Sequence, residues 1–202
     1  AAVQLKERRG DQMSKTLFEH LSPDTGLKRI LALDGGGVKG LLTLGMLKVL
    51  EDELRRRAHG APAFRLSDYY DLIGGTSTGA IISAGLALGM SVDELIGLYQ
   101  RLGPEVFGKS AGDGVFLQSR FESKNSRRAL HSALSTKTMG SEDLKTGLAI
   151  HAKRIDTGSA WVVTNHPLGV FYDPPAESNV FPNKRYRLTD LVLASAAAVR
   201  VA

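Results

Sequence analysis

The chain has 202 residues, of which 43% are hydrophobic, enough for one substantial core but not for a second independent domain. Its 26 Lys and Arg exceed its 21 Asp and Glu by five, a modest basic excess that suits anionic surfaces such as phospholipid headgroups, and we expect no nucleic-acid partner. The lack of cysteine excludes a disulfide framework, a cysteine metal site and a thiol nucleophile.

Residues 1–26 are polar, carry charges throughout and end in the turn signal SPDTG. They predict a partly helical lead-in segment ahead of a single domain over residues 27–202. The segment lacks the continuous apolar core of a secretory signal, and the longest apolar run, over 80–90, is much shorter than the roughly 20 residues that span a bilayer. We therefore expect a cytoplasmic protein whose contact with membranes is peripheral.

Two successive segments predict the order strand, turn, helix. The first joins LKRILALD (27–34), an apolar run without helical period that stops at three glycines, to LLTLGMLKVLEDELRRR (41–57), which has mostly helical spacing. The second joins LSDYYDLIGG (66–75), a candidate strand, to TGAIISAGLALGM (78–90). A third helix is expected over 91–103, because Ser91 and Glu94 stand at capping-box spacing.

The second half of the chain begins with a polar, basic stretch over 104–147, which predicts loops and short helices over the sheet. A pair of strands is expected in 147–156 and 160–165, around the turn TGS, followed by an irregular connection. LTDLVLASAAAV (188–199) predicts a helix with Thr189 as its N-cap. The fold class is thus α/β, with a central, mostly parallel sheet flanked by helices.

The stretch GGTSTG (74–79) places Ser77 between Gly75 and Gly79, after a predicted strand and before a predicted helix. These glycines leave room for a sharp turn that presents the serine hydroxyl at the top of the sheet, as a nucleophile requires. The alternative is that Ser77 only caps the helix beginning at Thr78. Both interpretations can hold together, because a nucleophile at a helix N-terminus also lies at the positive end of the dipole.

The stretch LDGGGVKG (33–40) contains G-x-G-x-x-G between a strand and a helix, as dinucleotide-binding folds do. A dinucleotide-binding fold also needs an acidic residue about 20 positions later to hold the ribose, and this residue is missing. A P-loop is excluded as well, because Lys39 precedes the last glycine, whereas a P-loop lysine follows it. The other chemical interpretation is that the amides of Gly35, Gly36 and Gly37 face an oxyanion near Ser77. A third interpretation is that the glycines only allow the following helix to pack closely.

Together, DGGGVKG and GGTSTG, some forty residues apart and in this order, resemble the patatin-like phospholipase family of the bacterial type. SVDELIGLYQRLGPEVF and LASAAA extend the resemblance. It implies a three-layer fold related to the α/β-hydrolases and a Ser/Asp dyad that cleaves acyl esters of phospholipids or other lipids, as a phospholipase A does, with no metal or organic cofactor. Ser77 is then the nucleophile, and Gly35, Gly36 and Gly37 form the oxyanion hole.

The motif also contains Asp34, which we expect to brace the loop, Gly40, and Lys39, which stands where the family usually has arginine. Lysine keeps the positive charge but loses the planar fork. The family's catalytic aspartate lies in an Asp-Gly-Gly or Asp-Gly-Ala motif after a helix end that 194–198 match, with Val199 in place of proline. We therefore expect the base beyond Ala202 and an incomplete domain, with the Asp-Gly pair at 113–114 serving only as a loop turn.

Three alternatives stay open. An α/β-hydrolase with a Ser-Asp-His triad would need a late histidine, for which His131, His151 and His166 are the candidates. A nucleotide-binding or signalling module would use Gly35 to Gly40 as a phosphate cradle. A catalytically inactive lipid-binding protein would present the basic stretches 124–128 and 184–187 to a membrane.

Overall fold

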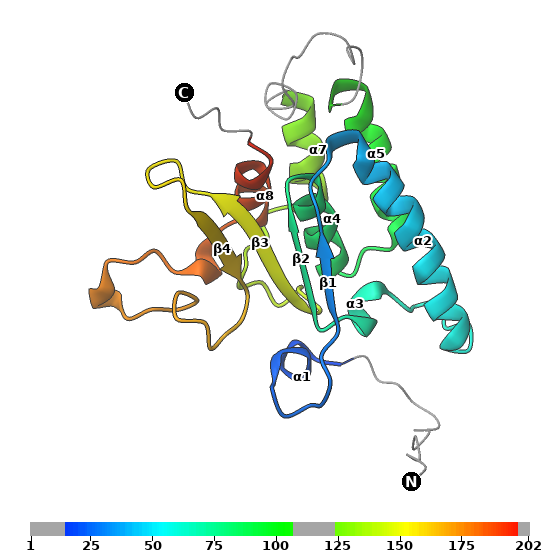
Figure 1. The fold of residues 1–202 in the computed structure, drawn as a ribbon, viewed down its shortest axis with the longest axis horizontal. Coiled ribbons are helices and arrows are strands. Elements are labelled where there is room, and N and C mark those ends of the chain that lie inside the picture. Colours follow the sequence, from blue (N-terminus) through cyan, green and yellow to red (C-terminus); the bar gives the residue numbers. More distant parts are fainter. Residues whose placement is uncertain (1–14, 107–123, 198–202) are drawn as a thin grey trace.

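The computed structural model describes residues 15–106 and 124–197 and centres on a four-stranded mixed sheet (Figure 1). The strands lie in chain order across the sheet; the pairs β1–β2 and β2–β3 are parallel, and β3–β4 is antiparallel. The predicted α/β fold with a mostly parallel sheet is therefore confirmed. The strands are β1 Ile30–Leu33, β2 Leu72–Thr76, β3 Gly147–Lys153 and β4 Ala160–Thr164.

The helices follow one another in the order the sequence predicts, with further short turns between them. They are α1 Leu17–Leu21, α2 Gly40–Arg57, α3 Leu66–Tyr69, α4 Thr78–Ala87, α5 Val92–Val106, α7 Lys124–Leu134 and α8 Leu188–Ala196, with 3₁₀ turns η1 Gly37–Lys39, η2 Ala176–Ser178 and η3 Asn183–Arg185. No helix in 15–106 or 124–197 has the length and apolar content needed to cross a membrane. The Asp-Gly pair at 113–114 lies outside the described residues.

The core lies between the sheet and α4, whose residues are all buried. Leu33, Ile73 and Ile150 point to this face because side chains alternate along each strand. Helix α8 packs beside α4 on the same face, against β3. The opposite face carries α1, and Ile30 there is 64% exposed.

The carboxyl ends of β1, β2 and β3 meet at one edge of the sheet, because these three strands are parallel. The glycine loop follows β1, Ser77 follows β2, and His151 pairs with Thr76 near the end of β3. In open α/β sheets, ligands bind outside the carboxyl ends of the strands. The topology therefore brings the two glycine motifs to one edge.

Three local predictions are corrected by hydrogen bonding and burial. The predicted strand over 66–75 begins with α3 instead, because the Asp68 carboxylate accepts a hydrogen bond from the Arg65 amide at 2.7 Å and starts a helical turn. Helix α8 begins after Arg187, so Thr189 is not its N-cap but lies buried within its first turn. Helix α5 continues past Gly103 to Val106.

The capping box of α5 is confirmed. The Ser91 amide donates to Glu94 Oε2 at 2.7 Å, and the Glu94 amide donates to Ser91 Oγ at 3.2 Å. These two bonds satisfy amides that the first turn of a helix leaves without partners. Hydrogen bonds from the Ser91 amide and from the Ser91 hydroxyl lower the pKa of the Glu94 carboxyl.

The lead-in segment is held to the sheet by a buried charged cluster around Asp71. One carboxylate oxygen accepts from Lys15 Nζ at 2.7 Å and contacts His20 Nδ1 at 2.9 Å, and the other accepts from the Arg29 amide at 2.9 Å. Burial raises the pKa of Asp71, but these hydrogen bonds outweigh it and bring the pKa to about 2. Burial lowers the pKa of His20, against the opposing effect of Asp71.

We predict that this cluster makes the protein less stable in acid. A folded-state pKa below the unfolded value means that the unfolded chain binds protons first, so the Asp71 contribution is complete above its ordinary pKa of 3.8 and is lost towards about 2. The lowered pKa of His20 likewise removes stability below its ordinary value of 6.5.

Asp71→Asn should lower the free energy of unfolding by about 2 kcal/mol at pH 7, since it removes hydrogen bonds to a charged group. It should also flatten the dependence on pH below 4. Urea unfolding across a pH series measures both effects, with Asp24→Asn, a change at an exposed site on the same segment, as control. An unchanged pH profile would show that the cluster does not anchor the segment.

Candidate active site

Ser77 adopts a strained backbone conformation between β2 and α4. Its φ of 52° and ψ of −121° lie in a region that residues with a side chain rarely occupy. Ser77 is the N-cap residue of α4, yet its side chain makes no capping hydrogen bond. The capping interpretation therefore does not describe its hydroxyl, and the half-buried side chain projects from a sharp strand-to-helix turn.

The glycines on either side of Ser77 are required by close backbone packing. A Cβ added at Gly75 would lie 2.5 Å from the carbonyl carbon and oxygen of Gly79 and 2.7 Å from Ser83 Oγ. One added at Gly79 would collide with the carbonyl oxygen of Leu33, at the end of β1. Both positions of the G-x-S-x-G pattern therefore exclude a side chain.

The glycine loop packs directly against this turn. A Cβ at Gly35 would lie 2.8 Å from Ser77 Cβ, so the structure brings the two motifs together. The Gly35 amide donates to Thr76 Oγ1 at 3.0 Å, and the Gly36 amide donates to Thr78 Oγ1 at 3.1 Å. Each of these two amides could bind an oxyanion only after its hydrogen bond to threonine breaks.

Gly37 differs from the two glycines before it. Its φ is 58°, a left-handed conformation, and none of the described residues accepts a hydrogen bond from its amide. It opens the 3₁₀ turn that leads into α2. Of the three predicted oxyanion donors, Gly37 is thus the one whose amide has no hydrogen-bond partner among residues 15–106 and 124–197, but it is also the one that is buried, whereas Gly35 and Gly36 are exposed.

Tyr99 of α5 connects the starts of α2 and α4. Its hydroxyl donates to the Thr78 carbonyl at 3.0 Å. A Cβ added at Gly40 would lie 2.8 Å from the Tyr99 hydroxyl oxygen. Burial raises the pKa of Tyr99, so the phenol stays protonated and can donate this bond. Gly40 thus serves close packing beside the loop.

A serine from the far end of the chain completes the turn. The Ser77 amide donates to Ser195 Oγ at 2.8 Å, and Ser195 Oγ donates to the His151 carbonyl at 2.5 Å. The sequence shows Ser195 only as part of the LASAAA stretch, and pattern reasoning assigns no role to it or to the Thr76 hydroxyl. The only available signal is that a residue with a hydroxyl group stands in each stretch, Thr76 in GGTSTG and Ser195 in LASAAA.

The remaining charged candidates are placed as follows. Lys39 and Asp34 are exposed, and no hydrogen bond of the Asp34 carboxylate occurs among the described residues, so the loop is braced by the threonines instead. In the basic stretch 184–187, Lys184 is paired with Asp173 at 2.5 Å, and the Arg185 guanidinium lies over the Phe181 ring.

The three candidate histidines lie apart from one another. His151 is exposed and pairs with Thr76 in the sheet, which places it at the edge that holds Ser77. His131 is exposed on α7, and His166 accepts a hydrogen bond from the Leu168 amide in a turn. In 15–106 and 124–197 no three His, Asp or Glu side chains cluster closely enough to hold a metal ion.

A strained serine between a parallel strand and a helix, beside a glycine loop from the neighbouring strand, has the geometry of the nucleophile elbow of serine hydrolases. The family model that matches this chain, over residues 31–199, is that of the patatin-like phospholipases. The chain belongs to this family.

Its curated relatives include patatins of Solanum tuberosum. Patatin-16 is 29% identical over 166 residues, which cover 76% of this chain and 43% of the relative. Patatin group A-3 is 29% identical over 167 residues with the same coverage. Patatin group J-1 is 34% identical over 131 residues, 58% of this chain and 34% of that protein. The chain thus spans less than half the length of these relatives.

We predict opposite effects of two Gly→Ala substitutions within helices. Gly79→Ala should lower the free energy of unfolding by at least about 2 kcal/mol, because the methyl group meets the backbone of β1. Gly45→Ala is the matched control in α2, where nothing lies within 4 Å, and it should raise stability by about 0.5–1 kcal/mol. Equal effects in chemical unfolding would contradict the close approach at Gly79.

Proposed function

We propose that the protein is a lipid acyl hydrolase of the phospholipase A type, with Ser77 as nucleophile. The observation that carries this proposal is the conformation of Ser77, which costs about 1–3 kcal/mol and leaves its hydroxyl outside the helix cap. A serine that served only as a cap would need neither feature. Membership of the patatin-like phospholipase family supports the lipid ester as substrate.

The proposed reaction is a two-step acyl transfer. An aspartate takes the proton of the Ser77 hydroxyl, the oxygen attacks the ester carbonyl, and the alcohol leaves as the acyl-enzyme forms. Water then releases the fatty acid by the same steps. In 15–106 and 124–197 no carboxylate forms a hydrogen bond with Ser77, and we propose the aspartate of the family's Asp-Gly motif as the base.

The developing oxyanion is stabilised by the glycine loop. The Gly37 amide is the first donor, and the Gly36 amide joins it when Thr78 yields its bond. A well-placed donor of this kind is worth about 3 kcal/mol. Lys39 adds positive charge beside the loop. A phosphate cradle made by the same loop would need both the Gly35 and the Gly36 amide to leave their threonine partners, one exchange more than the proposed oxyanion hole needs.

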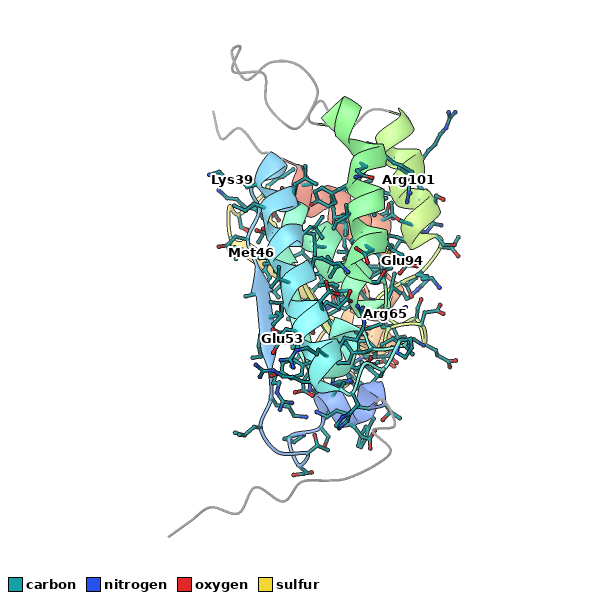
Figure 2. All side chains as sticks on the ribbon, turned by 90° about the vertical axis from the view of Figure 1, so that its right-hand side faces the viewer. Lys39, Met46, Glu53, Arg65, Glu94 and Arg101 are labelled. Atoms are coloured by element: carbon teal, nitrogen blue, oxygen red, sulfur yellow. The ribbon has the colours of Figure 1, made fainter. Side chains whose placement is uncertain are left out.

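A peripheral approach to lipid is supported by the surface beside the loop. Leu42 and Met46 of α2 are 68% and 60% exposed and follow Lys39 in the chain. Figure 2 shows Lys39 and Met46 on the outer side of α2, away from α5. A cation next to apolar side chains suits the boundary between headgroups and acyl chains.

We predict that Ser77→Ala abolishes both ester hydrolysis and labelling by a fluorophosphonate probe. The probe forms a covalent bond only with an activated serine, so the lost labelling identifies the nucleophile. Labelling should be measured by mass spectrometry on the chain of 202 residues and on the native protein with any residues that follow Ala202.

Ser83→Ala is the control, because Ser83 Oγ is buried in α4 and forms no hydrogen bond within the part of the chain that the structure describes. Retained hydrolysis in Ser77→Ala would overturn the proposal. Full activity of the chain that ends at Ala202 would overturn only the placement of the aspartate.

A second prediction separates the dyad from a triad. His151→Ala should change the rate of ester hydrolysis by less than threefold, because its ring is not the base in the proposed reaction. In a Ser-Asp-His enzyme, loss of the histidine would lower kcat by orders of magnitude. The same comparison with His131→Ala and His166→Ala covers the other candidates, and a collapse of activity in any of them would favour the triad.

A further inference from the structure

Ser195 occupies the position of a missing step in the β2–β3 ladder. The Gly147 amide donates to the Asp71 carbonyl at 3.1 Å, and Leu72 pairs with Gly147, so residues 147, 149 and 151 are the ones that bond to β2. Regular continuation would make the His151 carbonyl the acceptor for the Ser77 amide. The Ser195 hydroxyl lies between these two groups instead and bonds to both.

This arrangement allows the chain to leave the sheet at Ser77. A direct bond to His151 would extend β2 by one residue and keep Ser77 in the extended conformation. With the hydroxyl inserted, both backbone groups stay satisfied while φ turns to 52°. A hydroxyl can do this because it donates one bond and accepts another.

We propose that Ser195 is a positioning residue that fixes the direction of the Ser77 side chain by relaying the Ser77 amide to the His151 carbonyl. Ser195 bonds to the backbone amide of Ser77 and not to Ser77 Oγ, so it affects the nucleophile by holding the conformation of the turn. The proposal rests on the proposed function for its effect on catalysis. The hydrogen bonds themselves can be tested without any substrate.

Its position on α8 explains why the hydroxyl is held in place. Helix α8 packs against both β3 and α4, the two elements that the bridge connects. Leu191 and Val192 anchor the helix in the core, and Ser195 lies one turn further on. The Ser77 amide is thereby committed to Ser195, which leaves oxyanion binding to other amides.

Loss of this hydroxyl should loosen the turn without removing a group that touches substrate. We expect Ser195→Ala to lower kcat for a short-chain ester by 10- to 100-fold, because misplacing a reacting group by about 1 Å can cost about 100-fold. KM should stay within twofold. Ser195→Thr keeps the hydroxyl and should retain kcat within about threefold.

The control on the same helix is Thr189→Val. This change removes a buried hydroxyl that forms no hydrogen bond with any residue of 15–106 or 124–197 and keeps the side-chain shape, so kcat and KM should match the wild type. Equal losses of kcat in Thr189→Val and Ser195→Ala would mean that α8 is merely sensitive to substitution, which would contradict a specific relay.

The deciding experiment is amide hydrogen exchange at Ser77 in the native full-length protein, followed by NMR. In Ser195→Ala the Ser77 amide should exchange at least tenfold faster, while amides in the middle of β2 keep their rates. Ser195→Thr should show the wild-type rate. Should Ser195→Ala not fold, Ser195→Cys supplies a side chain of similar shape with much weaker hydrogen bonds.

An unchanged Ser77 exchange rate in Ser195→Ala or Ser195→Cys would overturn the relay. A wild-type protein that hydrolyses no ester would overturn the proposed function, and the exchange comparison would still decide whether Ser195 holds the turn. Faster exchange with an unchanged kcat would overturn the positioning role.

Discussion

The backbone conformation of Ser77 is the constraint on which the rest of the site depends. A positive φ at a residue with a side chain is unfavourable by about 1–3 kcal/mol, so the surrounding structure must impose it. Gly75 and Gly79 remove the side chains that would block the turn, Tyr99 holds the first carbonyl of α4, and Ser195 takes up the amide that the sheet no longer binds. Each support comes from a different part of the chain.

These supports also decide which backbone amides are left for a ligand. Two threonines that flank Ser77 occupy the amides of Gly35 and Gly36, and Ser195 occupies that of Ser77. The Gly37 amide, in a buried left-handed residue next to the turn, bonds to no acceptor within the described parts of the chain, and we propose it as the first oxyanion donor. In serine hydrolases generally, a donor that needs no reorganisation when negative charge develops is the main source of oxyanion stabilisation.

Much of this arrangement could be predicted from local patterns. The two strand-turn-helix units, the capping box and the meeting of Gly35 with Ser77 follow from apolar periodicity and the geometry of parallel strands. The α3 turn could not be separated from β2, because a short apolar run suits both. Ser195 lies 118 positions from Ser77 in the chain, and no periodicity links a hydroxyl to a backbone amide at that separation.

The most direct test of the account is a crystal structure of the native protein with an alkylphosphonate bound covalently to the nucleophile. The account predicts the phosphorus on Ser77 Oγ, a phosphonyl oxygen within about 3 Å of the Gly37 amide, and the Ser77 amide still bonded to Ser195. An adduct on another residue, or Ser77 with a negative φ and its hydroxyl capping α4, would contradict it.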